Sequence, residues 1–413
     1  MTQQTLATAF ALHQQGRLDE ARRLYESIIE TDPRHFDVLH LLGLVSHQMG
    51  ELQKAERFYL TAIGIKSDFA QIYTSYARVL HDLTRYEEAL ACHDLAIRLN
   101  PLDADAFTER GVLLKDMMRL EEALASYENS ILLRPDGALT YNNCGGAFQD
   151  LGRYDEALAS YDKAASLDPD YVVAHSNRGV ALRRMGRLDE AVLSYERAIC
   201  VQPDFADAYL NLANLSLEMK IFDDATISYE KCIFLKPDFP DAFGGLGNTF
   251  QALKKFEEAL ASYDGAIALR PDYAEAYSNR GEALKALDQL ENAVASNRRA
   301  IIIRPDYAEA HYNGGNALMA MNNPHAAIDS YDLALSLKPD YPEALNNRAI
   351  ALVDLMRMDE AVANYDQALL LKPDYAEAYS NRGIPLAALK RFDEAIASYD
   401  KAISFDAEYA DAY

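Results

Sequence analysis

The eleven residues PDYAEAYSNRG stand at positions 271–281 and occur again, unchanged, at positions 373–383. The two copies are 102 residues apart, which is three times 34, and a near copy, PDYAEAHYNGG, stands at positions 305–315. A fixed interval between similar segments is typical of a repeat array, in which each repeat packs against its neighbours. The copies therefore predict that the whole chain is organised at a period of 34 residues.

Counted from residue 2, the chain divides into twelve repeats of 34 residues. Position 20 of the repeat is alanine in all twelve, position 24 is tyrosine in ten, and position 32 is proline in ten. No linker interrupts this pattern, and we predict a single solenoid domain over residues 2–409. Its repeats begin at residues 2, 36, 70, 104, 138, 172, 206, 240, 274, 308, 342 and 376.

Each repeat is predicted to form two helices, helix A at about positions 1–14 and helix B at about positions 17–30. Positions 4, 8 and 11 share one helical stripe, and positions 20, 24 and 27 share another. Position 8 is always glycine or alanine, so that together with the alanine at position 20 it lets the helices approach while the tyrosine fills the adjacent space. Four glycines suit the left-handed end of helix A, namely Gly16, Gly50, Gly152 and Gly186.

Proline at position 32 is expected to end helix B. The aspartate that follows it, such as Asp272 or Asp374, is expected to cap the next helix A. Pro385 falls inside helix A of the last repeat, where we expect a kink, because proline lacks the N–H that the helix would use.

With these residues at these positions, the chain resembles the tetratricopeptide repeat family over nearly its whole length. The resemblance implies an all-α fold, a right-handed superhelical solenoid of about twelve helix-turn-helix repeats whose A helices line a concave groove. Residues 410–413, ADAY, resemble the start of a thirteenth repeat, so we expect the chain to be cut from a longer protein.

The net charge of the chain limits the classes of partner that it can bind. A net charge of −24 repels nucleic acid and anionic lipid, so we expect neither nucleic acid nor a membrane as a partner. The apolar runs are too short to span a bilayer. The four cysteines have no CxxC spacing and fit a reducing, cytoplasmic environment; they are Cys92, Cys144, Cys200 and Cys232.

One position of helix A is not explained by packing. Position 6 lies opposite the packed stripe, yet it is asparagine in seven repeats, although asparagine is a mediocre helix former. An amide both donates and accepts hydrogen bonds, so a row of asparagines can hold the backbone of an extended peptide. Inheritance through repeat duplication is the alternative explanation. The residues are Asn143, Asn177, Asn211, Asn279, Asn313, Asn347 and Asn381.

Position 2, one helical turn earlier, is acidic in eight repeats. One explanation is a capping box in the first turn, which also suits the helix dipole. The other is a carboxylate row that selects basic ligands. The acids are Asp37 and Asp105, followed by the predicted binding residues Asp207, Asp241, Glu275, Glu309, Glu343 and Glu377.

The two rows together resemble the groove of the repeat domain of O-linked N-acetylglucosamine transferases, best from Asp207 to Asn381. In that family asparagines grip the peptide backbone and acids read its side chains, which is what the resemblance implies here. This chain departs from the pattern with glutamate in four repeats and with Gly245 where asparagine is expected. A carboxylate clamp is excluded, because position 2 is acidic and position 5 never carries lysine.

Other polar rows are given structural roles. Successive A helices lie about 10 Å apart, too far for the histidines at position 12 to share one metal ion. Arginines at position 7 are expected to pair with the acid at position 25, such as Asp162 or Asp264. The histidines are His13, His47 and His81, and the arginines are Arg178, Arg280, Arg348 and Arg382.

No nucleophile, base and orienting group recur together, and no metal ligands cluster in the sequence. We therefore predict a protein-interaction scaffold that is not an enzyme, needs no cofactor, and binds extended, neutral to basic protein segments. The alternative is the substrate-recruiting region of a larger glycosyltransferase of the O-linked N-acetylglucosamine transferase type. Self-association into a homo-oligomer stays open.

Overall fold

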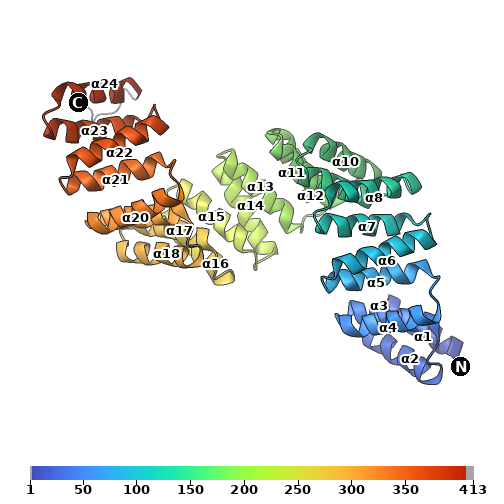
Figure 1. Cartoon of the computed structure of the whole chain (residues 1–413). Helices are drawn as coiled ribbons and strands as arrows, with labels where there is room; N and C mark the ends of the chain where they lie inside the picture. Colours follow the sequence, from blue (N-terminus) through green and yellow to red (C-terminus); the bar gives the residue numbers. More distant parts are fainter. Residues whose placement is uncertain (1, 406–413) are drawn as a thin grey trace. The chain divides into compact units, whose positions relative to one another are not determined.

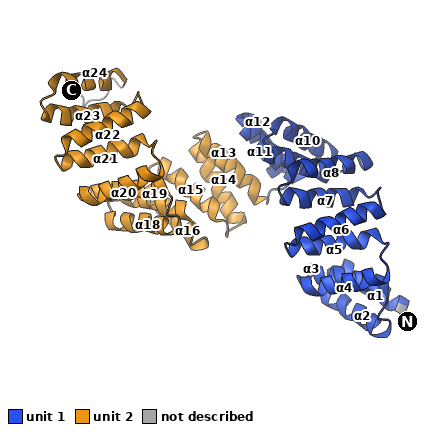
Figure 2. Cartoon of the chain, in the orientation of Figure 1, with its two compact units in different colours: residues 1–203 blue, residues 204–413 orange. Residues whose placement is uncertain are grey.

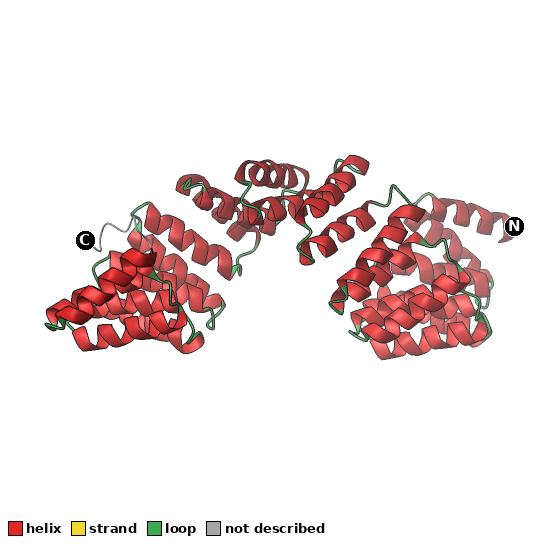
Figure 3. Ribbon diagram, turned by 90° about the horizontal axis from the view of Figure 1, so that it is seen from above, coloured by secondary structure: helices red, strands yellow, loops and turns green. Residues whose placement is uncertain are grey.

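The computed structural model describes residues 2–405, and all regular structure in this range is helical (Figure 3). The 24 helices of these residues alternate between a helix A of 13 residues and a helix B of 14 residues, as in α1 and α2. The all-α repeat fold is therefore confirmed. The predicted start of a thirteenth repeat at residues 410–413 lies outside the described residues.

The chain divides into two compact units, residues 1–203 and residues 204–413 (Figure 2). Each unit contains six repeats, and Figure 1 labels most of their helices along the chain. The A helices of the first unit are α1 (Thr2–Gln14), α3 (Phe36–Gln48), α5 (Ala70–Asp82), α7 (Ala104–Asp116), α9 (Ala138–Asp150) and α11 (Val172–Arg184). Its B helices are α2 (Leu18–Thr31), α4 (Leu52–Ile65), α6 (Tyr86–Leu99), α8 (Leu120–Leu133), α10 (Tyr154–Leu167) and α12 (Leu188–Val201).

The second unit repeats the arrangement. Its A helices are α13 (Ala206–Glu218), α15 (Pro240–Ala252), α17 (Ala274–Ala286), α19 (Ala308–Ala320), α21 (Pro342–Asp354) and α23 (Ala376–Ala388). Its B helices are α14 (Phe222–Leu235), α16 (Phe256–Leu269), α18 (Leu290–Ile303), α20 (Pro324–Leu337), α22 (Met358–Leu371) and α24 (Phe392–Phe405). In each unit, helix A packs against its own helix B, helix B packs against the next helix A, and neighbouring A helices touch from α3 to α11 and from α13 to α23.

The core is built from the positions that the period singles out. Ala191 and Tyr195 of α12 are fully buried, and the ring of Tyr195 fills the space over Gly179 of α11. A Cβ atom on Gly179 would lie 2.5 Å from the Tyr195 ring, which is closer than carbon atoms approach. The glycine is therefore required for close packing of helix A on helix B in that repeat.

The end of helix A is left-handed in every repeat. The four predicted glycines have φ of 73–75°, and eight other residues at the same position of the repeat have φ of 58–62°. This backbone conformation is unfavourable for any residue with a Cβ atom, so the turn geometry is imposed by the packing of the two helices. The eight residues are Thr84, Met118, Lys220, Lys254, Asp288, Asn322, Met356 and Lys390.

We expect Gly152→Ala to lower the free energy of unfolding by about 1–2 kcal/mol, because a residue with a Cβ atom is strained at positive φ. The added Cβ atom would have no other atom within 4 Å, so the loss comes from the backbone strain and not from a clash. Met118 occupies the equivalent place and its side chain is 71% exposed. Met118→Gly removes the strain with little loss of packing, and we expect a gain of about 0.5 kcal/mol after the entropy cost of glycine. Urea denaturation of the two variants measures both shifts, and equal destabilisation by both would contradict the assignment.

The expectation about helix caps is wrong. Helices α17 and α23 begin after Tyr273 and Tyr375, which take the N-cap position and make no capping hydrogen bond with their side chains. The aspartates Asp272 and Asp374 lie one residue earlier, in the turn. Helix α23 runs through Pro385 to Ala388 at the same length as the other A helices, and the kink expected at this proline stays a prediction.

Candidate functional site: the asparagine face

The seven predicted asparagines occupy the same position on seven A helices. Asn143 and Asn177 lie on α9 and α11 of the first unit, and the other five lie on α13, α17, α19, α21 and α23 of the second. None is fully exposed: Asn313 retains 9% of its surface and the others are half-buried. The asparagines are therefore partly covered by neighbouring helices.

The amide groups connect successive A helices. In five cases Nδ2 of the asparagine donates a hydrogen bond to a side chain 31 or 35 residues earlier, on the preceding helix A. Each bond ties one repeat to the next, a role that the sequence did not reveal. The donor and acceptor pairs are Asn177–Asn142 (3.0 Å), Asn279–Asn248 (2.9 Å), Asn313–Ser278 (3.1 Å), Asn347–Asn316 (2.9 Å) and Asn381–Asn346 (3.2 Å).

A second set of asparagines, at position 9, links this face to the core. Oδ1 of Asn248 accepts a hydrogen bond from Nδ2 of Asn279 and another, of 2.8 Å, from the hydroxyl of the buried Tyr263. Oδ1 of Asn316 does the same for Asn347 and, at 2.8 Å, for Tyr331. Sequence reasoning missed position 9, although asparagine there is followed fifteen residues later by the core tyrosine.

The asparagine face opens into a cavity of about 550 Å³ in the second unit. Its walls include Glu282 and Lys285 of α17, Asn316 and Tyr312 of α19, and Asn347 of α21. This volume is in the range of ligand-binding pockets, which combine apolar walls with a few polar groups. The cavity is therefore lined by one predicted asparagine, Asn347, and by one that sequence reasoning missed, Asn316.

The acidic row is occupied by ion pairs within the repeats. In the second unit, four of its acids bond to the basic residue that follows helix B of the same repeat, and these pairs are Asp241–Arg270 (2.8 Å), Glu275–Arg304 (2.8 Å), Glu309–Lys338 (3.4 Å) and Glu343–Lys372 (3.4 Å). Because all four are partly exposed, each is worth about 0–1 kcal/mol. Of the other four acids, Asp105 of the first unit pairs with Arg134 at the same spacing, Glu377 accepts a bond from Asn346 at 3.4 Å, and Asp37 and Asp207 are exposed.

The position of these acids and their ion pairs argue against the capping-box explanation of the acidic row. Glu275 is the second residue of α17, after the N-cap Tyr273 and Ala274, so it does not stand at the third position that a capping box requires. The guanidinium of Arg304, its partner, also lies 3.8 Å from the centre of the Tyr307 ring. Hydrogen bonding to Asp241 raises the pKa of Arg270. The row is thus mostly a set of charge pairs between repeat elements.

The arginines at position 7 pair as predicted. Each bonds to an acid on helix B of the preceding repeat at 2.6 Å, in the pairs Arg178–Asp162, Arg280–Asp264, Arg348–Asp332 and Arg382–Asp366. These pairs connect α11, α17, α21 and α23 to helix B of the preceding repeat.

The histidine row pairs with the following repeat. Nε2 of His47 lies 2.6 Å from Asp82, and Nε2 of His81 lies 2.9 Å from Asp116.

Within residues 2–405 no three potential metal ligands come together, and no helix in that range is long and apolar enough to cross a membrane. All 24 helices of the described part belong to the array, which contains no separate catalytic domain. The cytoplasmic location stays a prediction.

Family models match repeats along most of the chain. A model described as TPR repeat matches residues 145–186, 181–220, 247–288 and 357–384. Three models described as tetratricopeptide repeat match residues 12–79, residues 312–363, and residues 70–101, 206–239, 274–307 and 376–409. No match is found among curated proteins.

Two solved structures are similar to parts or most of this chain. The crystal structure of the APC/C hetero-tetramer Cut9–Hcn1 is similar over 98% of this chain and 93% of that chain, with a TM-score of 0.52 and 14% identity. The crystal structure of YrrB, described as a TPR protein with an unusual peptide-binding site, is similar over 45% of this chain and 95% of that chain, with a TM-score of 0.40 and 24% identity. At 14% identity, the likeness to Cut9–Hcn1 shows the fold alone.

Proposed function

Because the chain belongs to the tetratricopeptide repeat family, we propose that it is a protein-interaction scaffold whose asparagine face binds an extended protein segment. The proposal concerns the second unit, where Asn279, Asn313, Asn347 and Asn381 follow one another on α17, α19, α21 and α23. The observation that carries it is the cavity of about 550 Å³ beside Asn347 on this face.

The asparagines keep hydrogen-bonding capacity for a ligand. In Asn279, Asn313 and Asn381, Nδ2 donates once within the array, while Oδ1 accepts no hydrogen bond from any described residue. Each amide therefore has one N–H and one carbonyl oxygen for a peptide unit. Neighbouring helices lie about 8–10 Å apart, which is about three residues of extended chain at about 3.3 Å each. Four helices thus suit a segment of about nine residues.

Recognition is proposed to depend on the backbone of the segment more than on its charge. Four acids of the neighbouring row are already paired with Arg270, Arg304, Lys338 and Lys372, which leaves little unpaired negative charge there. The net charge of −24 nevertheless disfavours acidic segments and nucleic acid. We therefore propose neutral to basic protein segments as partners.

The alternative is that this chain is the substrate-recruiting region of a glycosyltransferase of the O-linked N-acetylglucosamine transferase type. The succession of four asparagines on four A helices favours it, whereas the paired acids depart from a row that reads side chains. Sequencing the gene beyond the codon for Tyr413 discriminates, because a nucleotide-sugar transferase domain there supports the alternative and another domain contradicts it.

Site-specific photo-cross-linking tests where the segment binds. A photoreactive amino acid replaces Ile384, which is 53% exposed on α23 at the position of Asn248 and Asn316, or Leu370, which is 81% exposed on α22. Peptides selected from a random library against the whole chain are expected to attach at Ile384 and not at Leu370. Attachment at Leu370 alone, or equally at both, would place the segment elsewhere on the chain.

A further inference from the structure

The first unit contains a second polar cavity, of about 620 Å³, between the A helices α5 and α7. Thr74 and Arg78 of α5 and Glu109 of α7 line it. It lies apart from the asparagine row, which begins at Asn143 in the repeat after α7. None of its residues takes part in the function proposed above.

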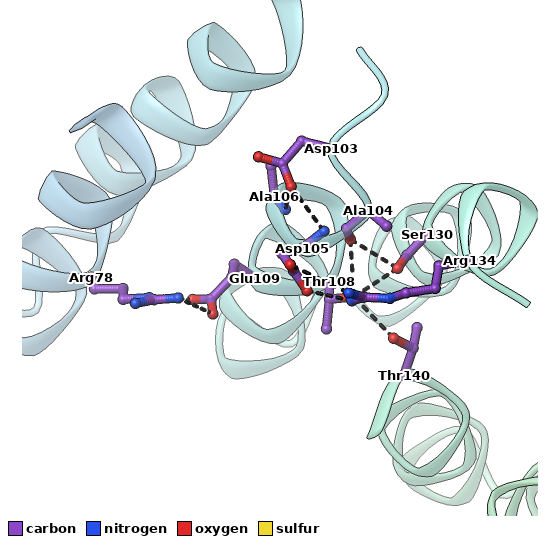
Figure 4. A network of polar contacts seen from close by, with 10 residues as sticks. All are labelled: Arg78, Asp103, Ala104, Asp105, Ala106, Thr108, Glu109, Ser130, Arg134 and Thr140. Atoms are coloured by element: carbon purple, nitrogen blue, oxygen red, sulfur yellow. Dashed lines mark hydrogen bonds and ion pairs between the residues drawn. The ribbon is translucent and has the colours of Figure 1, made fainter. Parts of the chain in front are cut away.

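The cavity carries an excess of negative charge. Four carboxylates line it, those of Asp68, Asp103, Asp105 and Glu109, against the single guanidinium of Arg78. Arg78 pairs with Glu109 at 2.7 Å, and Arg134, from outside the lining, pairs with Asp105 (Figure 4). Two carboxylates therefore remain beyond the two cations, which favours a positively charged ligand.

Thr74 supplies an independent sign of a missing ligand. Its side chain is only 8% exposed, and its Oγ1 has no hydrogen-bond partner among the described residues. Thr108, the equivalent residue one repeat later, makes three hydrogen bonds, to Ala104 O, Ser130 Oγ and Thr140 Oγ1 (Figure 4). A buried hydroxyl without a partner is unfavourable because it has lost its hydrogen bonds to water, so Thr74 stands where a donor is expected.

Other repeats show which kind of donor is missing. In the second unit, Ser278 occupies the position of Thr74 and accepts from the amide Nδ2 of Asn313 on the next helix A. In the first unit, the position of that asparagine is taken by Glu109, whose carboxylate has no N–H and bonds to Arg78. Glutamate in place of asparagine at this position removes the donor to Thr74. The cavity is lined by both Thr74 and Glu109.

A smaller cavity of about 190 Å³ shares Arg78 and Glu109 with the first. His93 lines it and stands where most repeats have the core tyrosine. The imidazole is 2% exposed, its Nδ1 has no partner among the residues described, and burial lowers the pKa of His93 to about 4. A second buried polar atom without a partner thus lies beside the same ion pair.

We propose that the cavity between α5 and α7 binds the guanidinium group of an arginine side chain from a protein partner. Guanidinium is a planar cation with five N–H donors and no acceptor. It matches a cavity that offers carboxylate oxygens and the unpartnered hydroxyl of Thr74. The site is independent of the asparagine face.

The test uses the peptide N-acetyl-Gly-Gly-Arg-Gly-Gly-amide and the same peptide with citrulline, which has the shape of arginine without its charge. Saturation-transfer difference NMR on the whole chain measures both dissociation constants. We expect the arginine peptide to bind at least tenfold more tightly. Equal binding of the two peptides overturns the proposal.

Two variants locate the site. Arg78→Asn combined with Glu109→Asn reproduces the pair Asn248–Asn279 of the second unit and returns an amide donor to the vicinity of Thr74; binding is expected to weaken at least tenfold. Asp103→Asn keeps a good cap for α7, where Asp103 accepts from Asp105 N and Ala106 N, but removes one charge, so binding should weaken severalfold. Undiminished binding by Asp103→Asn, or by a folded double variant, contradicts the proposal.

A third variant separates this site from the asparagine face. Replacing Asn279, Asn313, Asn347 and Asn381 by alanine changes only the second unit, so the arginine peptide is expected to bind it as it binds the native chain. A loss of binding in this variant would show that the arginine peptide uses the asparagine face.

Discussion

Tyr263→Ala is expected to lower the free energy of unfolding by about 3–5 kcal/mol, the range for removing a large aromatic side chain from a core. Tyr263 is fully buried, and its ring occupies the space that Gly247 leaves open, where a Cβ atom would lie 2.6 Å away. The glycine has no side chain with which to fill the resulting hole. Urea denaturation of the whole chain, followed by circular dichroism, measures the change, and a loss below about 1 kcal/mol would contradict the assigned packing.

The hydroxyl of this tyrosine can be separated from its ring by a matched pair of variants. Tyr263→Phe removes a donor that bonds to Asn248 and Gln251, each at 2.8 Å, and is expected to cost about 1 kcal/mol. Tyr127→Phe should cost nothing or stabilise, because its buried hydroxyl has no partner in residues 2–405 and the residue at the position of Asn248 is Val112. Similar losses in both variants would show that the asparagine contributes nothing.

Much of the fold could be predicted because the repeat restricts packing so strongly. Alanine at position 20 and tyrosine at position 24 are buried where the stripes placed them, as Ala191 and Tyr195 illustrate. The helix starts could not be predicted from propensity alone. Aspartate is a better cap than tyrosine, but Tyr307 takes the N-cap of α19 and lies under the guanidinium of Arg304, which is itself paired with Glu275 on the preceding helix A.

Only those features of the candidate site that depend on a single helix could be predicted from the sequence. Helical geometry placed Asn279 opposite the packed stripe, but its bond to Asn248 depends on how far one helix A stands from the next. The pairing of Glu275 with Arg304 joins residues 29 apart, across a whole helix pair. A basic residue after helix B in every repeat of the second unit from Lys236 to Lys372 was the available signal.

The combined replacement of Asn279, Asn313, Asn347 and Asn381 by alanine is expected to weaken binding of a library-selected peptide by about 2–6 kcal/mol. The estimate assumes one hydrogen bond to the peptide per amide, at about 0.5–1.5 kcal/mol each. Two kcal/mol corresponds to a factor of about 30 in the dissociation constant. Isothermal titration calorimetry of the peptide with the native chain and with the variant measures the difference.

The same four amides also join neighbouring repeats, so the variant is expected to lose some stability as well. Alanine is the better helix former and offsets part of this loss, so the helical content at 25 °C should be retained, which circular dichroism verifies before each titration. Asn143→Ala with Asn177→Ala is the matched control, because it removes asparagines of the same position from the first unit, and binding should stay within twofold. Undiminished binding by the folded four-alanine variant would leave the asparagines as links between repeats and nothing more.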